Sequence, residues 1–530
     1  MDDRKLLLAV ALLAAVSLGL SLLFFNKVLD GGDEGQILES GKLISEGKVV
    51  YKDVANLYSP GVFFLAAVLN SLFPSDYEIA ARLAIALISV AAVAVLFLIS
   101  TRLMPSPYVF IPPCLLLVWG IPFQHIISPT WPALLFQLVA VYLAVRGIEK
   151  PGGRNLLFQG VAVGAVAFFK QNMGLYTLLG IAVFHLIDAA HDAKISGKGR
   201  ETRAFLEGLY KRKPFVLGVM AIPAITIAYF ALNSALPDLY SSVLLRADSA
   251  HLDNCWNMPF PTLASIVPRG ISLEELYRSS INSAYYAVLF LYAAAFLYAV
   301  RKRTAFGDVE NKALLVIALV ALFQFHMVVF PRTDRNHLLF SIPLAYVLAA
   351  FFSAKLSKRA HESRKPRDRL AGSLPLAYIA LFALLGLALI SYAYMPYLRG
   401  TGMTARNGLV FPATQETVDF LNSADYVNNR TAPDEKVFVA GSFATFYTLS
   451  QRYPAARYVQ LFPGMTSPLE VQEEIINSVR NSRVRYAVIS ANDKIDRCSF
   501  ADYDGRILTY LNSSFELEAR FGNFTVLRKK

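Results

Sequence analysis

The sequence predicts a polytopic α-helical membrane protein that ends in an exterior α/β domain. The 530 residues are 55% hydrophobic and only 17% charged, and a mean hydropathy of +0.44 is too apolar for a soluble protein of this size. Apolar segments long enough to cross a bilayer recur from Leu6 to about Tyr394, and short alternating strands and helices follow from Pro396. We therefore expect a transmembrane domain over 1–395 and an exterior soluble α/β domain over 396–530.

The apolar segments divide into eleven predicted spans. A hydrocarbon core about 30 Å thick needs roughly 20 apolar residues per helix. The first segment lacks a small-residue cleavage site before Asn26, which favours a retained anchor over a signal peptide. The segment 59–74 has only about 14 apolar residues between its prolines, too few for a spanning helix. The predicted spans are 6–25, 79–100, 107–125, 131–146, 156–170, 174–190, 215–235, 281–300, 313–331, 338–354 and 371–395.

Basic residues set the direction of these spans. Cytoplasmic loops carry an excess of Lys and Arg, and the dense basic cluster over 355–369 falls inside only if 59–74 does not cross the membrane. We therefore place 59–74 in the outer interface as a juxtamembrane helix. The N-terminus is then cytoplasmic, and the first loop (26–78) and the C-terminal domain face the exterior of the plasma membrane. The net charge of +12 reflects this topology, so no nucleic-acid partner is expected.

The C-terminal domain is predicted to be a small α/β sandwich with a mostly parallel sheet, because short buried strands alternate with helices. No Gly-rich phosphate loop follows any strand, so nucleotide binding has no support, and a structural or acceptor-handling role is expected. Cys114 falls inside a span, so at most one disulfide, Cys255 to Cys498, can form. Helices are predicted over 416–427, 443–449, 468–481 and 506–511, strands over 436–440, 457–461 and 485–489, and a final hairpin ending at 524–527.

Ionisable residues gather at the outer ends of the spans. Almost none lie near the span centres, which disfavours an ion-coupled transporter. Many such charges are only solvated loop residues. Lys170 stands out because it closes an apolar span, and the alternating charges over 331–337 are typical of a preorganised site for an anion or a carboxylate. The outer group comprises Asp33, Glu34, Asp53, His125, Lys170, His326, Arg332, Asp334, Arg335 and His337.

One acidic turn facing several basic helix ends suits the transfer of a sugar from a lipid phosphate. The leaving phosphate is a weak base, so cations suffice to stabilise its charge, whereas the incoming hydroxyl needs one base. A glycoside hydrolase would instead need two carboxylates. The turn over 29–35, which contains Asp33 and Glu34, supplies the carboxylate just outside the bilayer.

These residues resemble the GT-C glycosyltransferases, specifically the family 39-like branch that includes protein O-mannosyltransferases and aminoarabinose lipid A transferases. The resemblance covers the whole membrane part loosely and the first ~100 residues best. The Trp-Trp-Asp motif of oligosaccharyltransferases in the same superfamily is absent, since no two of the three Trp are adjacent. The matching segments are Asp33-Glu34, 45–53, 58–61 before a short apolar helix, 80–83, 169–174 and 332–337.

The resemblance implies a polyprenyl- or dolichyl-phosphate sugar as donor, and inverting transfer to a lipid, glycan or protein acceptor at the exoplasmic face. Asp33 would match the catalytic base, and Glu34 would orient the acceptor or a helper group. Lys170 and Arg332 are the candidates for the donor phosphate. The usual Pro-Pro pair is Ser59-Pro60 here, which leaves the donor and acceptor preference open. Further site candidates are Asp53, His125, Asp334, Arg335 and His337.

No cofactor is predicted with certainty. Asp33, Glu34 and His337 are suitable ligands for a divalent metal, but no spacing signature supports one. Two alternatives to a glycosyltransferase remain. A lipid-linked glycan transporter or polymer ligase would need no transfer dependent on Asp33, and a receptor would use its exterior domain to bind a partner. Eleven spans are far more than a receptor needs for anchoring.

Overall fold

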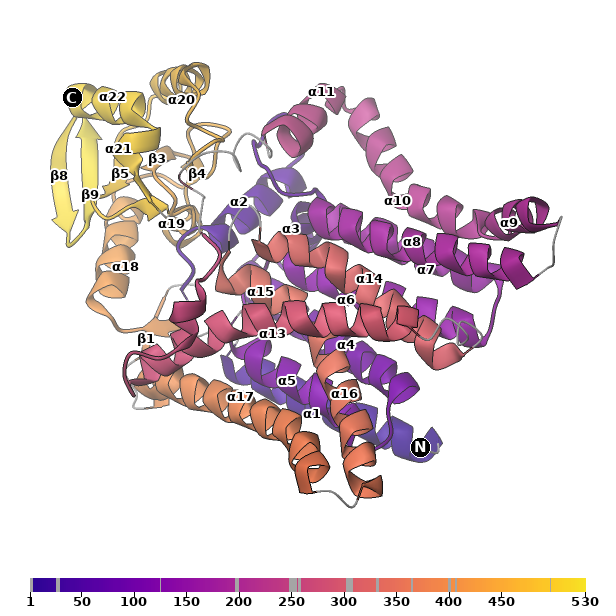
Figure 1. Ribbon diagram of the computed structural model, residues 1–530. Coiled ribbons are helices and arrows are strands. Elements are labelled where there is room, and N and C mark those ends of the chain that lie inside the picture. Colours follow the sequence, from indigo (N-terminus) through magenta and orange to yellow (C-terminus); the bar gives the residue numbers. More distant parts are fainter. Residues whose placement is uncertain are drawn as a thin grey trace.

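The computed structural model is a helical body with a mixed α/β domain at one end (Figure 1). The C-terminal domain, drawn in orange to yellow, lies beside the helix α2, which belongs to the first loop. The residues described are 3–24, 29–123, 125–195, 200–246, 255, 259–301, 308–329, 333–363, 366–398, 402–405, 408–495 and 497–530.

Every predicted span corresponds to a helix or a pair of helices. In the described part of the chain, eight helical segments are long and apolar enough to cross a membrane, which confirms a multi-pass membrane protein. The helices at the predicted spans are α1 (Asp3–Phe24), α4 (Tyr77–Leu103), α5 (Ile111–Trp119), α6 (Thr130–Glu149), α7 (Gly153–Phe169), α8 (Gln171–Ile195), α10 (Lys213–Leu232), α13 (Leu273–Arg301), α14 (Val309–Val329), α15 (Arg335–Ser341) with α16 (Pro343–Glu362), and α17 (Pro366–Leu398).

Shorter helices connect these spans. The apolar segment at 59–74 forms α3 (Gly61–Leu72), whose 12 residues are too few to cross a bilayer. It packs against α2 (Asp33–Ser45), which follows the acidic turn. The other connectors are η1 (Tyr108–Phe110), η2 (Ile121–Phe123), α9 (Glu201–Tyr210), α11 (Leu236–Tyr240), η3 (Ser241–Arg246) and η5 (Leu263–Ile266).

Small residues let the membrane helices pack closely. α14 lies in the middle of the body, with α6, α8 and α13 against it (Figure 1). A Cβ atom on Gly180 of α8 would lie 2.6 Å from the Cα atom of Val320 of α14. Gly160 of α7 and Gly218 of α10 likewise face each other's helix backbones. Such glycine contacts bring helix axes together where lipid supplies no hydrophobic drive for association.

The C-terminal domain is built on a five-stranded sheet in the order β4-β3-β5-β9-β8. Its helices fall at the predicted places: α18 (Gln415–Asn428), α19 (Thr445–Ser450), α20 (Leu469–Asn481) and α22 (Gly505–Ser514), with the short α21 (Phe500–Tyr503) before the last. The strands of the sheet are β3 (Lys436–Ala440), β4 (Tyr453–Pro454), β5 (Tyr486–Ser490), β8 (Phe515–Phe521) and β9 (Phe524–Lys529). Two small ribbons are formed by β1 (Gly402–Thr404) with β2 (Val410–Pro412) and by β6 (Lys494–Ile495) with β7 (Cys498–Ser499).

The sheet differs from the prediction in two respects. It is mixed rather than mostly parallel, because β3 pairs in parallel with β4 and β5, whereas β9 is antiparallel to both β5 and β8. The tight turn at Gly522 joins β8 directly to β9, and so short a connection permits only antiparallel pairing. The strand expected over 457–461 lies earlier, at β4. Tyr458 instead forms an isolated bridge with Ala55 of the first loop.

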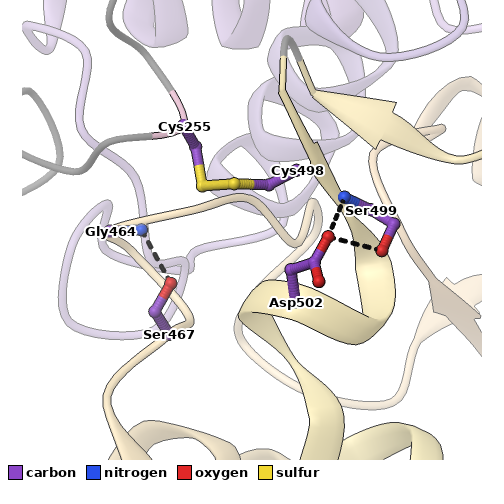
Figure 2. The surroundings of a disulfide bond; sticks show 6 residues. All are labelled: Cys255, Gly464, Ser467, Cys498, Ser499 and Asp502. Atoms are coloured by element: carbon purple, nitrogen blue, oxygen red, sulfur yellow. Dashed lines mark hydrogen bonds between the residues drawn. A yellow bond between two sulfur atoms is a disulfide. The ribbon is translucent and has the colours of Figure 1, made fainter.

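A disulfide joins Cys255 to Cys498, the one pairing that the cysteine positions left possible (Figure 2). Cys498 opens β7, and Cys255 lies between α11 and α13, 243 residues away in the sequence. The bond therefore ties the C-terminal domain covalently to a connection between membrane helices.

Candidate active site

Asp33 is the first residue of α2 and is exposed. The side chain of Asp30 shapes the turn before it, because one carboxylate oxygen accepts the backbone N–H groups of Gly32 (3.1 Å) and Glu34 (2.9 Å). The phenol of Tyr58 donates to Oδ1 of Asp33 over 3.3 Å. Asp33 is thus an accessible carboxylate at a helix N-terminus, where the helix dipole favours negative charge.

Glu34 has a different environment from its neighbour. It is only 2% exposed, and Arg82 of α4 donates to both of its oxygens, from Nε to Oε1 over 2.9 Å and from Nη2 to Oε2. A backbone hydrogen bond from Ile127 also reaches this carboxylate. Burial raises the pKa of Glu34, and the Arg82 guanidinium opposes that shift. The geometry makes Glu34 an anchor that fixes α2 to the membrane body.

Lys170 lies where the chain passes from α7 to α8. Its extended backbone, with φ −151° and ψ 103°, interrupts the helix there. The ammonium donates to the hydroxyl of Thr130 over 3.1 Å. The carboxylates that act on it electrostatically are Asp334 and Asp33. Asp33 and Asp334, from two other segments of the chain, therefore both interact electrostatically with Lys170.

Asp334 caps α15. Its Oδ1 accepts the backbone N–H of His337 over 2.9 Å, and its Oδ2 pairs with Nδ1 of the same histidine over 2.7 Å. Asp334 and His337 therefore form one unit beside Lys170. Arg335 begins the same helix, but its side chain is outside the described part of the chain, and Arg332 lies wholly outside the described residues.

A second set of bonds joins the first loop to the residue after Lys170. The Ser59 hydroxyl donates to Oε1 of Gln171 over 2.6 Å and accepts the Gln171 backbone N–H over 3.0 Å. Gly61 abuts Phe168, since a Cβ atom there would lie 2.7 Å from the Phe168 carbonyl oxygen. The departure at Ser59 from the usual Pro-Pro pair thus supplies a hydroxyl that fixes the first loop against the start of α8.

Three of the other candidates lie elsewhere. Asp53 is exposed and accepts the Val49 backbone N–H over 2.8 Å, a bond within its own loop. His125 is 4% exposed, and its Nε2 lies 2.7 Å from the Pro122 carbonyl oxygen. With Arg82 it lines a cavity of about 10 Å³, roughly enough for one water molecule. His326 bonds the Tyr176 phenol over 2.7 Å.

Sequence reasoning missed the roles of Arg82 and Tyr58. Both occur in the segments that resemble the GT-C family, but neither was singled out. The available signal for Arg82 was a guanidinium at the start of an otherwise apolar span, a position that requires a buried partner. As for a metal, the described residues include no group of three or more His, Cys, Asp or Glu side chains arranged to hold one.

The chain is similar to known proteins in part of its sequence and in its fold. Residues 58–199 match the model of a family described as dolichyl-phosphate-mannose-protein mannosyltransferase. ArnT from Cupriavidus metallidurans, in the apo state, is 13% identical with a TM-score of 0.58 over 99% of this chain and 98% of its own. The chain therefore has the same fold as ArnT. The predicted GT-C resemblance is thereby confirmed for the architecture.

A second solved structure has a similar fold. The archaeal oligosaccharyltransferase AglB from Archaeoglobus fulgidus, in complex with an inhibitory peptide and a dolichol-phosphate, is 12% identical with a TM-score of 0.53, over 100% of this chain and 75% of its own. None of the curated proteins matches this chain in sequence. The segment that matches the family model includes Tyr58, Arg82 and Lys170.

Proposed function

We propose that this protein is an inverting glycosyltransferase that moves a sugar from a polyprenyl- or dolichyl-phosphate donor to an acceptor hydroxyl. The observation that carries the proposal is the electrostatic interaction of an exposed carboxylate, Asp33, with a half-buried ammonium, Lys170. The family-model match to dolichyl-phosphate-mannose-dependent enzymes and the dolichol-phosphate in the AglB complex support a lipid-phosphate donor. The acceptor is a lipid, glycan or protein.

The chemistry assigns one role to each charge. Asp33 accepts the proton of the acceptor hydroxyl as its oxygen attacks the anomeric carbon from the face opposite the phosphate. The bond from that carbon to the phosphate oxygen breaks, and the electron pair leaves with the polyprenyl phosphate. Lys170 stabilises the negative charge that develops on this phosphate, with Arg332 as the second proposed cation. The Thr130 hydroxyl accepts a hydrogen bond from the Lys170 ammonium and so positions it, and Asp334 acts on it electrostatically.

We further propose that the site faces the exoplasmic side of the plasma membrane, with the N-terminus in the cytoplasm. The disulfide between Cys255 and Cys498 supports this orientation, because disulfides persist in oxidising compartments. The membrane domain, 1–395, then carries the catalytic residues, and the exterior domain, 396–530, packs on the first loop.

The decisive experiment replaces the proposed base. Membranes containing Asp33→Asn are incubated with a series of labelled polyprenyl-phosphate sugars, and the movement of label is followed. Transfer is expected to be lost, because an amide cannot accept the hydroxyl proton. Asp76→Asn is the matched control, since Asp76 is an exposed carboxylate of the same loop. Transfer at the wild-type rate by Asp33→Asn would remove this residue from the mechanism. A result in which glycan export requires the protein but sugar transfer does not would support a transporter function instead.

A further inference from the structure

The C-terminal domain touches the chain directly beside Asp33. Thr445, the first residue of α19, donates its backbone N–H to the Gly31 carbonyl over 3.1 Å. Its hydroxyl donates to the Asp30 carbonyl over 2.5 Å. Thr445 is 7% exposed, so neither bond competes with bulk water. These two bonds join segments that lie 415 residues apart in the sequence.

Glycines in the acidic turn permit this contact. A Cβ atom on Gly35 would lie 2.1 Å from the Thr445 nitrogen, and one on Gly32 would lie 2.3 Å from the Ser442 carbonyl oxygen. Side chains at either position would force the two backbones apart. Gly32 and Gly35 are therefore explained by close approach of the loop and first turn of α19, a relationship that the membrane domain alone does not require.

The loop that contacts the turn is itself fixed within the C-terminal domain. The carboxylate of Asp493 accepts both the backbone N–H and the hydroxyl of Ser442, and it also accepts the Tyr503 phenol over 3.1 Å. The side-chain amide of Gln460 donates to the Ser442 carbonyl over 3.0 Å. Thr445 thus follows a loop that hydrogen bonds hold in place, so the C-terminal domain sets its position.

The same domain also holds the far end of α2. The Tyr453 phenol donates to Oε1 of Glu46, the C-cap residue of α2, over 2.9 Å. The ammonium of Lys42 lies 3.9 Å above the centre of the Tyr453 ring. Helix α2 is therefore held at both ends by the C-terminal domain, and Glu34 binds it to α4.

We infer that Thr445 is a positioning residue for Asp33, so that the C-terminal domain completes the active site by fixing the turn over 30–35. The inference rests on the proposed function, in which Asp33 is the base. A base must lie within hydrogen-bond reach of the hydroxyl it deprotonates, and a displacement of about 1 Å costs up to about a hundredfold in rate. The Lys170 ammonium donates to Thr130 of α6, so the proposed donor-binding group is separate from this contact.

The test compares three variants of the full-length protein in detergent. Thr445→Val removes the hydroxyl that bonds the Asp30 carbonyl, and Thr445→Ser keeps it. Thr448→Val is the control, because its hydroxyl bonds back to the Thr445 carbonyl within α19. We expect Thr445→Val to lower kcat by about tenfold to a hundredfold with the donor KM unchanged. Thr445→Ser should restore most of the rate, and Thr448→Val should retain it.

Amide hydrogen exchange over residues 29–40 supplies a readout that needs no activity. Thr445→Val should exchange faster than the wild type in this segment, whereas Thr448→Val should not. Should Thr445→Val fail to fold, Gln460→Met removes the brace on Ser442 at nearly constant volume, and the same direction of change in kcat and exchange is expected.

The outcomes separate the two proposals. Wild-type kcat and exchange in Thr445→Val, or equal losses in Thr445→Val and Thr448→Val, would overturn the positioning role while leaving the glycosyltransferase intact. The wild type could also transfer no sugar while Thr445→Val still exchanges faster over 29–40. That result would support the link between the domains and contradict the proposed reaction.

Discussion

Arg82 of α4 and Glu34 of α2 form a two-point ion pair with both side chains buried. Because Glu34 is adjacent to Asp33, the pair connects the proposed base to the first long helix after the loop. A buried pair of this kind adds little stability compared with a well-packed apolar pair, but it is costly to break on one side only.

Arg82→Met should lower the free energy of unfolding by about 3–5 kcal/mol, because it leaves the Glu34 carboxylate buried without its countercharge. The double variant with Glu34→Gln should lose less than Arg82→Met alone. Thermal unfolding in detergent measures both. The control is Arg102→Met, which breaks the more exposed pair with Glu149 and should cost at most about 1 kcal/mol. Equal losses in Arg82→Met and Arg102→Met would contradict the assignment.

Lys170→Met should raise the KM for the lipid-phosphate donor by roughly tenfold to a hundredfold, since a charge-assisted bond to a phosphate contributes about 1.5–3 kcal/mol. Steady-state kinetics with varied donor and saturating acceptor provide the measurement. Lys48→Met, which removes an exposed ammonium of the first loop, serves as the comparison. A donor KM that does not change in Lys170→Met would place the phosphate elsewhere.

Cys255→Ser and Cys498→Ser should each lower the melting temperature of the protein, because either change opens a covalent loop of 243 residues. Disulfides contribute about 2–4 kcal/mol, mainly by restricting the unfolded chain. Reductant should lower the wild-type melting temperature to the same extent and leave both variants unaffected. If reductant destabilises the variants as strongly as the wild type, the bond is not the cause.

Stability of the C-terminal domain should fall as the pH rises toward neutrality. Asp504 is fully buried, and burial raises its pKa from 3.8 to about 7. Between pH 3.8 and about 7, the unfolded chain has lost the Asp504 proton whereas the folded chain retains it. The free energy of unfolding therefore decreases as the pH rises across this window. Chemical unfolding from pH 4 to 8 tests this. Asp504→Asn should flatten the profile, whereas Asp434→Asn, at an exposed carboxyl, should leave its slope intact.

Local patterns predicted much of the fold. The apolar runs located the helices of the membrane part, of which eight segments among the described residues are long and apolar enough to span, rather than the eleven predicted. The segment 59–74 forms the short helix α3, and the placement of Cys114 left one possible disulfide. The helices of the C-terminal domain followed from their periodicity. The direction of strand pairing could not be predicted from local sequence, because the antiparallel pairing of β9 with β5 depends on how distant segments meet.

The candidate site was predictable only in part. Asp33, Lys170 and Asp334 were named from charge at span ends, and both carboxylates act electrostatically on Lys170. His125 and Asp53 carried the same signal but bond within their own segments. No local pattern indicates that Thr445 bonds the Asp30 carbonyl, because that contact exists only once the whole chain has folded.

The contact between Thr445 and the acidic turn also orders events during biosynthesis. The ribosome makes Asp33 long before Thr445, and every membrane helix after α1 is made between these two moments. A partly translated chain therefore presents its carboxylate without the support that fixes it. Under the proposed function, a nascent chain would become active only after its C-terminal domain has folded, so that incomplete copies left in the membrane would not consume the proposed donor.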